Sequence, residues 1–506
     1  MPDDQRHTIA FLGDPSTHGG AAVERHETHI SLVFLAGERA YKLKRAVAYA
    51  YLDFSTAEKR RQACEAELAL NRRTAPELYL EVRPIRRGPD GRVGWEADGD
   101  IVDWVVVMRR FRQERRLDAI GEAGELTLPL LHALAAHIAA FHDEAEQCRD
   151  HGGAAAMAEL VRENDECLRG SRSVAFPDAQ VRELREQSGE WVRRLAGLLD
   201  GRRAEGKVRR CHGDLHLRNI CVLDGTPVLF DCLEFSEAFA TIDVLYDLAF
   251  LLMDLGHQGH PDAANRVFNR YLDLTGEGDG LAAMPLFLSL RAAIRAHVMA
   301  IALKSDADAS AAAEPRRYLD AAIAALKPSP PRLIAIGGLS GTGKSTIASK
   351  LAATLGALPG ARVLRSDVIR KRLFGLDPEA RLPESAYSAE MTSRVYETIR
   401  TQASAALRAG YCAIIDAVAL RPEERQSFAE VARQAQAPFA GLWLTAPAEM
   451  LIARVAARLH DASDATREIV AQQLRADTGP LDWQLIHAGE DIDATLTAAR
   501  DALGLA

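Results

Sequence analysis

Cysteine is scarce in this chain and is not arranged in pairs. The 506 residues include seven cysteines, and none of them forms a Cys-x2-Cys spacing. The missing spacing argues against a zinc site, and the odd number argues against a framework of disulfides. We therefore expect free thiols, most of them buried, and a cytoplasmic protein.

The chain also lacks a signal-peptide pattern, an uncharged apolar run long enough to span a membrane, and an excess of basic residues. Met1–His7 has no charged-then-apolar order. The most apolar long segment is Leu286–Leu303. It carries Arg291, Arg295 and His297, so we expect a core helix and no membrane partner. The net charge of −9 argues against a protein that coats nucleic acid.

The remaining composition is that of a globular protein with more than one core. Hydrophobic residues make up 48% of the chain and charged residues 26%. The length corresponds to roughly three compact units. Prolines 328, 330 and 331 cannot lie inside a helix and favour an extended spacer. We expect one domain over residues 1–327 and a second over residues 332–506.

The most informative stretch is residues 338–345, which read Gly-Leu-Ser-Gly-Thr-Gly-Lys-Ser. An apolar run precedes it and a helical pattern follows it, which is the strand–loop–helix context of a phosphate-binding P-loop. The glycines let backbone N–H groups point at phosphate oxygens. The lysine supplies a cation for the β- and γ-phosphates, and the serine hydroxyl can ligate Mg²⁺. The residues expected to bind ATP here are Gly338, Ser340, Gly341, Thr342, Gly343, Lys344, Ser345 and Thr346.

Two further carboxylates are expected at the P-loop site. Residues 362–367 read as a second parallel strand that ends in Asp367, and residues 411–416 read as an apolar strand that ends in Asp416. Ligands of open α/β sheets bind at the carboxyl ends of strands. We therefore expect Asp367 to orient or deprotonate an acceptor hydroxyl, and Asp416 to hold Mg²⁺.

Four arginines follow these carboxylates along the chain. Arg370 and Arg372 come just after the second strand, where they could hold an anionic acceptor. Arg454 and Arg458 lie four residues apart and therefore on one face of a helix. A polar loop follows them, and paired arginines in that place suit a lid that closes on the transferring phosphoryl group.

A second phosphate-handling pattern lies upstream. Residues 212–219 read His-Gly-Asp-Leu-His-Leu-Arg-Asn, and an apolar hairpin that ends in Asp231 follows. This order matches the catalytic loop and the metal-binding aspartate of protein-kinase-like enzymes. We expect Asp214 to accept the proton of a substrate hydroxyl. Asn219 and Asp231 are expected to hold Mg²⁺ through oxygen atoms.

The residues before this pattern are typical of a kinase small lobe. A hairpin is predicted between residues 29 and 43, a helix over residues 58–73, and strands over residues 79–85 and 102–108. No Gly-x-Gly-x-x-Gly covers the hairpin, whose turn contains a single glycine. The last strand enters residues 109–111, where a kinase hinge would contact adenine.

Two lysines compete for the role of the ATP lysine. Lys42 and Lys44 share one face of a strand because side chains alternate with a period of two. One of them is expected to pair with the ATP phosphates and with a carboxylate on the predicted helix. Glu67 is our choice for that carboxylate and Glu65 the alternative, while the choice between the lysines stays open.

Each half resembles a known family. His-Gly-Asp-Leu-His-x-x-Asn at residues 212–219 resembles the aminoglycoside phosphotransferases. Asp243 and Asp247 also fit that family, although we expect them to cap a helix or hold a loop. The P-loop half resembles small kinases of the zeta-toxin and gluconate-kinase type. Together the halves resemble the bacterial proteins that join an aminoglycoside phosphotransferase to an ATP-binding domain. The resemblance implies an α+β bilobal kinase-like domain followed by an α/β P-loop domain with a parallel sheet.

These patterns predict an ATP- and Mg²⁺-dependent phosphotransferase that acts on a small hydroxylated molecule. The acceptor stays open. An aminoglycoside is a polycation and needs an acidic cleft, to which Glu234 and Glu237 could contribute, whereas a sugar or polyol is at least as compatible. One alternative is a first half that senses a ligand and regulates the P-loop half. Another is a toxin-like kinase of nucleotide sugars. The oligomeric state is also open.

Overall fold

The computed structural model describes residues 4–28, 30–49, 52–171, 173–303, 311–457 and 463–505. The chain forms two compact units. The first consists of Met1–Arg185, Val192–Leu251 and Ala293–Arg317. The second consists of Glu186–Trp191, Leu252–Ala292 and Tyr318–Ala506.

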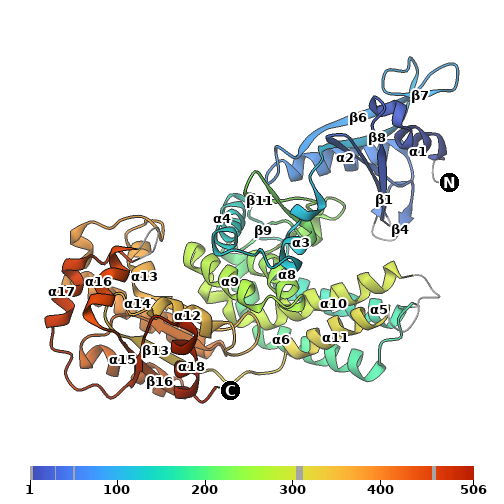
Figure 1. Ribbon diagram of the computed structural model, residues 1–506. Helices are drawn as coiled ribbons and strands as arrows, with labels where there is room; N and C mark the ends of the chain where they lie inside the picture. The colour runs from blue at the N-terminus through green and yellow to red at the C-terminus, as the bar shows by residue number, and fades with distance from the viewer. Residues whose placement is uncertain are drawn as a thin grey trace. The chain divides into compact units, whose positions relative to one another are not determined.

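A six-stranded antiparallel sheet with the strand order β1-β2-β3-β8-β6-β7 opens the first unit. Helix α2 packs against one face of this sheet and α1 against the other (Figure 1). A separate two-stranded ladder, β4–β5, precedes α2. The elements are α1 (Arg6–Gly13), β1 (Val23–Glu27), β2 (Ser31–Ala36), β3 (Arg39–Lys44), β4 (Ala48–Tyr49), β5 (Leu52–Asp53), α2 (Ala57–Asn71), β6 (Tyr79–Arg87), β7 (Val93–Gly94) and β8 (Asp100–Arg109).

Alternation along the strands decides which side chains meet each helix. Leu32 and Phe34 of β2 pack on the α1 side, whereas Leu35 packs on the α2 side. The predicted helix and strands of this small lobe are confirmed. The predicted hairpin is confirmed from Ser31 onward, and His29 lies outside the described residues.

The structure places the single-glycine turn of the predicted hairpin at the end of the sheet opposite Lys44. The Gly37 turn lies at the end of the sheet where β8 exits, since the Arg110 backbone N–H donates to the Glu38 carbonyl (2.9 Å). Ser31 pairs with Lys44 at the opposite end. Strands β1 and β2 are joined at that lysine end by residues 28–30, which contain no glycine.

Helices dominate the chain after the small lobe. Two short antiparallel ladders, β9–β12 and β10–β11, hold the predicted catalytic segment, and the predicted hairpin before Asp231 is confirmed as β10–β11. The elements are α3 (Leu117–Glu122), α4 (Leu128–Glu144), α5 (Gly153–Gly170), α6 (Asp178–Ala204), β9 (Val208–Arg210), β10 (Ile220–Leu223), β11 (Thr226–Leu229), α7 (Glu237–Ala240), β12 (Thr241–Asp243), α8 (Val244–His257), α9 (Pro261–Thr275), α10 (Met284–Ala302) and α11 (Ala313–Ala325).

One stretch of these helices is long and apolar enough, by length and composition, to cross a membrane. This stretch is Glu277–Ala302, and 61% of its most apolar window is buried inside the structure. Arg291, in its middle, is only 4% exposed. Burial against the protein is the usual state of a core helix, as predicted from the charged residues in this segment.

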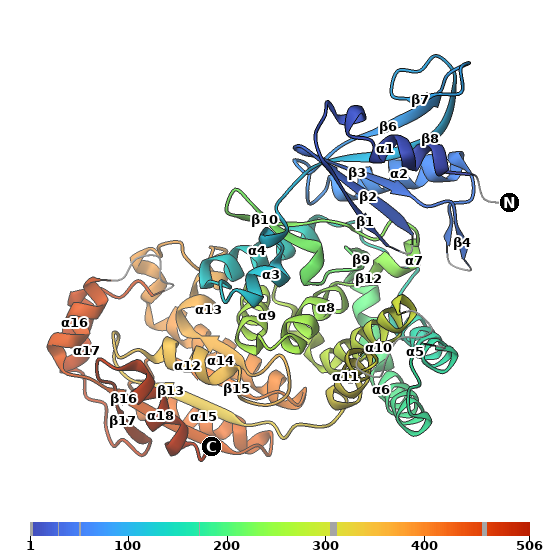
Figure 2. The ribbon, with the colours of Figure 1, turned by 45° about the vertical axis from the view of Figure 1, so that its right-hand side comes forward.

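A five-stranded parallel sheet with the strand order β14-β15-β13-β16-β17 forms the centre of the second unit. The predicted parallel sheet is thereby confirmed. Figure 2 shows its strands among the surrounding helices. The elements are β13 (Leu333–Gly337), α12 (Lys344–Ala352), β14 (Arg362–Arg365), α13 (Ser366–Leu373), α14 (Ala389–Arg408), β15 (Ala413–Asp416), α15 (Pro422–Gln434), β16 (Phe439–Thr445), α16 (Ala448–Ala456), α17 (Arg467–Arg475), β17 (Gln484–His487) and α18 (Ile492–Ala502).

Helices cover both faces of this sheet, so its strands can be apolar throughout. Ile334 and Ile336 of β13 pack on one face with Leu351 of α12 and Leu503, which follows α18. Helices α14 and α15 contact the strands from the other face. All five residues of β13 are buried. This packing fixes the end of β13, from which the glycine-rich loop departs.

Within the second unit, α9 packs against the edge strand β14. The Asn269 side chain accepts from the Val363 backbone N–H (2.8 Å) and donates to the Ala361 carbonyl (3.1 Å). It thus occupies the place of a neighbouring strand, because the backbone groups of an edge strand otherwise lack partners. Arg362 of β14 also forms an ion pair with Asp273 of α9 (2.6 Å). The division expected near residue 327 remains a prediction, and α9 belongs to the second compact unit.

We expect Asn269→Ala to lower the free energy of unfolding by about 1–3 kcal/mol, because it leaves the buried Val363 N–H without its acceptor. Urea denaturation of the full-length protein measures the change. Arg266→Ala, on the same helix and half-buried, is the matched control. An Asn269→Ala variant as stable as this control would show that the side chain does not support β14.

Candidate active sites

Five charged side chains form a network between β3 and α2. Lys42 Nζ contacts Glu67 Oε1 (2.8 Å) and Asp231 Oδ1 (2.6 Å). Lys44 Nζ contacts Glu67 Oε2 (2.7 Å) and the Glu234 carboxylate. Burial alone would raise the pKa of Glu67, but the two lysines outweigh it and lower this pKa to about 2. One helix carboxylate therefore holds both lysines.

The structure separates the residues between which the sequence left a choice. Glu67 is buried and pairs with both lysines, whereas Glu65 is exposed on α2 and pairs with Arg61 (2.7 Å). The Lys42 side chain keeps 13% of its surface exposed, and that of Lys44 keeps none. Lys42 therefore faces the site, while Lys44 is enclosed between two carboxylates.

We expect Lys44→Met to destabilise the protein by about 3–5 kcal/mol, because it leaves Glu67 and Glu234 as buried charges with too few partners. Lys42→Met is expected to affect ATP binding more than stability. Urea denaturation and ATP-binding measurements on both variants test this division of roles. Lys59→Met, at an exposed ion pair, is the control and is expected to change little. The reverse pattern would exchange the roles of the two lysines.

The predicted catalytic residues meet around the β10–β11 hairpin. Asn219 Nδ2 donates to the Asp214 side chain (2.8 Å) and to its carbonyl (3.0 Å). Asp231 follows β11 and has a left-handed backbone with φ of 64°. Its backbone N–H donates to the Tyr79 hydroxyl (3.1 Å). The site thus brings together Lys42, Asp214, Asn219 and Asp231 from separate segments; these residues and Glu67 are named the kinase-like site below.

Two histidines and an arginine act on the carboxylate of Asp214. Burial favours the neutral acid, but the interactions of the carboxylate with His216, His212 and Arg295 outweigh it and hold the pKa of Asp214 well below its usual range. His216 Nε2 lies 3.4 Å from the Asp214 carboxylate. Asp214 is therefore ionised at neutral pH, as a residue that orients or deprotonates a hydroxyl must be.

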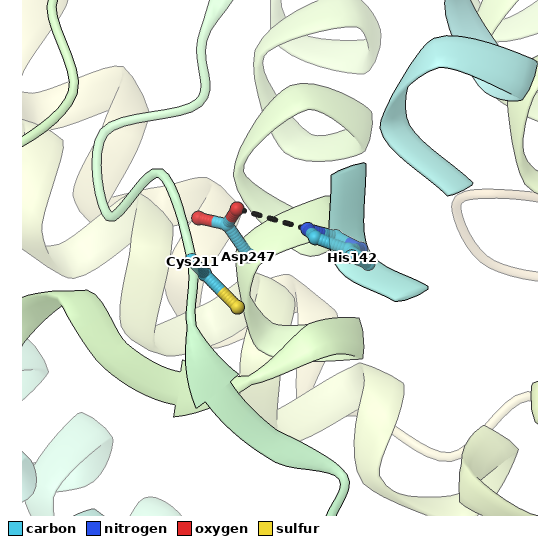
Figure 3. Close-up of side chains that lie close together, drawn as sticks. All are labelled: His142, Cys211 and Asp247. Atoms are coloured by element: carbon cyan, nitrogen blue, oxygen red, sulfur yellow. Dashed lines mark hydrogen bonds and ion pairs between the residues drawn. The ribbon is translucent and has the colours of Figure 1, made fainter. Parts of the chain in front are cut away.

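A buried aspartate, Asp247, holds the backbone of the catalytic loop in place. Asp247 accepts from the backbone N–H groups of His212 (3.1 Å) and Gly213 (2.9 Å). It also contacts His142 Nε2 (3.1 Å), as Figure 3 shows. Asp243 pairs with the buried guanidinium of Arg202 (2.7 Å). The structural roles expected for Asp243 and Asp247 are thus confirmed.

His142, Asp247 and Cys211 also form the kind of cluster that can bind a metal ion, since their ligand atoms lie within 4.8 Å of one another. Both Asp247 oxygens accept backbone N–H groups, however, and the Cys211 thiol contacts the Ile242 carbonyl (3.5 Å). These contacts favour an anchor for the catalytic loop over a metal site.

Two residues that shape the kinase-like site were not predicted from the sequence. Asn71 accepts from the Cys232 backbone N–H (2.8 Å) and donates to the Glu67 carbonyl. Its spacing of four residues from Glu67 is a helical signal that could have identified it. Tyr79, which bonds to Asp231, had no such signal because its partner is 152 residues away.

The two glutamates expected in an acidic acceptor cleft are engaged elsewhere. Glu234 is buried against Lys44. Glu237 is exposed and forms an ion pair with Arg210 (3.5 Å). Their charges are therefore already paired, which weakens the case for a polycationic acceptor.

The glycine-rich loop of the second unit follows β13 and leads into α12. Gly338 has φ of 129°, and a Cβ there would overlap the Leu444 carbonyl oxygen. Gly341 has φ of 93°, and a Cβ there would meet the Leu451 carbonyl at 2.7 Å. Both positions thus require glycine for conformation and for space. The loop curls at the N-terminus of α12, which favours the binding of anions.

The predicted metal-binding pair of this loop is in contact. Ser345 Oγ donates to Asp416 Oδ2 (2.6 Å), at the carboxyl ends of neighbouring strands β13 and β15. Arg365 Nε lies 3.4 Å from the same Asp416 oxygen. Lys344 Nζ donates to the Leu339 carbonyl (3.0 Å), across the loop. Thr342 donates to the same carbonyl (2.9 Å).

A cavity of about 260 Å³ opens beside this loop. It is lined by Ser340, Gly343, Lys344 and Ser345 of the loop and also by Asp367 and Arg370. Asp367 does not end the strand as predicted, because β14 ends at Arg365 and Asp367 lies in the first turn of α13. Burial raises the pKa of Asp367. We name this cavity and its lining the P-loop pocket.

The other predicted residues of this half lie elsewhere. Arg372 donates to the Leu272 carbonyl (3.4 Å) and does not line the P-loop pocket. Arg454 reaches the Gly489 carbonyl, and Thr346 is exposed on α12. Arg458 lies outside the described residues. The pairing of Arg454 with Arg458 as lid arginines therefore stays a prediction.

Comparison with known proteins agrees with both halves of this architecture. Residues 53–287 match the phosphotransferase enzyme family, and residues 333–480 match an AAA domain. These matches, with the two sites described above, define the protein as a kinase, an enzyme that transfers phosphoryl groups.

The chain is 32% identical over 469 residues to the uncharacterized protein Rv2004c of Mycobacterium tuberculosis (strain ATCC 25618 / H37Rv). The matched residues make up 90% of this chain and 91% of the relative. The chain belongs to the family of this mycobacterial protein. Among solved structures, a choline/ethanolamine kinase family protein of Mesorhizobium loti is 15% identical and covers 63% of this chain and 98% of its own, with a TM-score of 0.39. A gluconokinase of Sinorhizobium meliloti 1021 is 18% identical, and the match covers 34% of this chain and 92% of the gluconokinase chain, with a TM-score of 0.25.

Proposed function

We propose that the protein has two ATP-binding sites and that each transfers the γ-phosphoryl group of ATP to the hydroxyl of a small molecule. The contact between Ser345 and Asp416 in the P-loop pocket carries this proposal, because it pairs the loop hydroxyl with a strand-end carboxylate beside Lys344. The domains are assigned as residues 1–327 and 332–506. The seven cysteines are all free, which supports a reducing, cytoplasmic environment.

In the P-loop pocket, the backbone N–H groups and Lys344 hold the phosphates in place. Asp367 orients the acceptor hydroxyl and takes its proton as the oxygen bonds to the γ-phosphorus. The bond from that phosphorus to the bridging oxygen breaks, and ADP leaves. A pKa raised by burial makes Asp367 a better base than an exposed aspartate.

Both sites fit Mg²⁺, which prefers oxygen ligands. Ser345 and Asp416 would hold it in the P-loop pocket, and Asn219 and Asp231 in the kinase-like site. The ion would neutralise the charge that develops on the phosphate oxygens. In the kinase-like site Lys42 binds the phosphates, Glu67 keeps that lysine in place, and Asp214 receives the proton of the acceptor.

Two observations favour a neutral or anionic acceptor over an aminoglycoside in the kinase-like site. Arg295 carries a permanent positive charge that acts on Asp214, so the base has a cation nearby. The nearby glutamates are paired with Lys44 and Arg210. A polycation would meet repulsion where its hydroxyl must lie.

Two observations favour the alternative of a sensing first unit. Lys42 is bonded to Asp231, the residue that would hold the metal ion, and the turn at the lysine end of the sheet contains no glycine. In this arrangement nucleotide binding must first separate Lys42 from Asp231. A unit of this kind could bind a nucleotide without efficient transfer.

A screen of full-length protein against a metabolite pool tests the proposal, with acceptor-dependent release of ADP as the readout. The wild type is compared with Asp214→Asn, Lys344→Ala and the double variant. Each product is expected to disappear in one single variant, which assigns it to a site, and all products in the double variant. ADP release that survives in the double variant, or no binding of ATP to the wild type, would contradict the proposal.

A further inference from the structure

A hydroxyl of the chain itself is bonded to the carboxylate that is proposed to act as the base of the P-loop pocket. Ser463 lines this pocket together with Asp367. Burial raises the pKa of Asp367, and a hydrogen bond from the Ser463 side chain opposes this rise. The serine hydroxyl thus points its proton at the group that would remove it.

The same carboxylate lies among the groups that would hold the γ-phosphate. Lys344 and Asp416 line the pocket with Asp367, and besides burial their charges affect the pKa of that aspartate. Ser345 donates to Asp416 (2.6 Å). The Ser463 hydroxyl, the base and the phosphate-binding residues therefore line one cavity of about 260 Å³.

The residue that follows Ser463 is held by three contacts. Asp464 accepts from the Leu382 backbone N–H (3.2 Å) and from the Tyr387 hydroxyl (3.2 Å). Its other oxygen lies 3.5 Å from Nζ of Lys371, a lysine with no exposed surface. These contacts fix the backbone next to Ser463. A hydroxyl that is fixed beside its base has the advantage of an intramolecular reaction.

Two neighbouring hydroxyls have other partners. Tyr387 donates to Asp464. Thr466 caps helix α17, because its side chain accepts from the Ile469 backbone N–H (3.4 Å). The hydrogen bond to the base therefore distinguishes Ser463 from both of them.

We propose that Ser463 is an autophosphorylation site, to which the P-loop site transfers the γ-phosphoryl group of ATP within one chain. This rests on the proposed function of the second unit. Asp367 takes the proton of Ser463 as the serine Oγ bonds to the γ-phosphorus. The bond from that phosphorus to the bridging oxygen breaks, and ADP leaves. A small acceptor and Ser463 compete for the same phosphoryl group, because both need the base.

Mass spectrometry of the full-length protein tests this assignment. The Asp214→Asn protein, in which transfer by the kinase-like site is reduced, is treated with a phosphatase, purified from it and incubated with ATP and Mg²⁺. Peptide mapping is expected to find one phosphate per chain, on Ser463. Its rate of formation is expected to be the same at every protein concentration, because donor site and acceptor belong to one chain.

Variants in the same background then assign the reaction to the P-loop pocket. Ser463→Ala is expected to remove the phosphate, and Ser463→Thr, which keeps a hydroxyl, to retain part of the reaction. Asp367→Asn is expected to slow it by about 10²–10⁴, with affinity for a non-hydrolysable ATP analogue unchanged. Ser385→Ala, an exposed serine that does not line the pocket, is the matched control. If Ser463→Ala does not fold, Asp367→Asn decides.

Four results would overturn the inference: Ser463 stays unmodified although the ATP analogue binds, the phosphate lies on another residue, Asp367→Asn modifies Ser463 at the parent rate, or the rate rises in proportion to protein concentration. The proposed function fails separately, if affinity for the ATP analogue does not depend on Lys344.

Discussion

Lys344→Ala lowers phosphoryl transfer by the second unit by about 10²–10³, the loss expected when one preorganised donor to developing charge is removed. In the structure, Lys344 Nζ crosses the glycine-rich loop to the Leu339 carbonyl (3.0 Å). The cation is thus held beside the phosphate-binding backbone before ATP arrives. Alanine keeps the helix and removes only this charge. Turnover with the acceptor found by the metabolite screen measures the loss, in the Asp214→Asn background.

The matched control for this prediction is Lys350→Ala. Lys350 lies on the same helix, is exposed, and forms only a surface contact with Asp493 (3.3 Å). It removes the same charge from α12 without touching the loop, so turnover is expected to stay at the level of the parent. Equal turnover in Lys344→Ala and Lys350→Ala would show that the P-loop assignment is wrong. A lowered urea midpoint in Lys344→Ala alone would instead indicate a change in folding.

The parts of the sites that the sequence predicts are those encoded over short stretches. The residues of the loop from Gly338 to Ser345 are contiguous, and the positive φ angles of Gly338, Gly341 and Gly343 belong to the local backbone. Asp214 and Asn219 lie five residues apart and are hydrogen-bonded. Asp416 could be placed because an apolar strand that ends in a carboxylate has one position in a parallel sheet.

The parts that the sequence did not predict depend on contacts between distant segments. Period-two alternation places Lys42 and Lys44 on the same face, and only the approach of Glu234 shows that Lys44 is enclosed. Asn269 acts as a strand partner for β14 across 94 residues of sequence. Nothing local distinguishes that asparagine from a solvent-exposed one.

The contacts of the predicted arginines also could not be predicted from the sequence. Arg370 and Arg372 are equivalent in sequence, but a rotation of two helical positions sends one into the P-loop pocket and the other to the Leu272 carbonyl. Arg454 has the expected helical position, yet its guanidinium bonds to the Gly489 carbonyl. Helical spacing predicts which residues share a face. The direction of that face follows from packing that the spacing does not contain.

Asp214→Asn is expected to reduce phosphoryl transfer by the kinase-like site by about 10²–10⁴, the usual worth of a positioned general base. Asparagine keeps the shape of the side chain and can still contact Asn219, but it cannot take the proton of the acceptor. Binding of ATP with Mg²⁺ is expected to persist, because Lys42, Asn219 and Asp231 are unchanged. Transfer and binding are measured on the full-length protein in the Lys344→Ala background, so that the second unit contributes little.

Asp231→Ala and the control Asp224→Asn complete the test between an enzyme and a sensor. Asp231→Ala removes a metal-binding carboxylate, so it weakens Mg²⁺-dependent nucleotide binding itself. Asp224 is exposed in the turn of the same hairpin, at φ of 50°, which asparagine adopts readily. Asp224→Asn is therefore expected to change neither property. A sensing first unit would show no transfer for Asp214→Asn to remove, while Asp231→Ala with an intact Lys344 would change the turnover of the second unit. If neither Asp214→Asn nor Asp231→Ala alters binding or transfer, residues 212–231 do not form a kinase site.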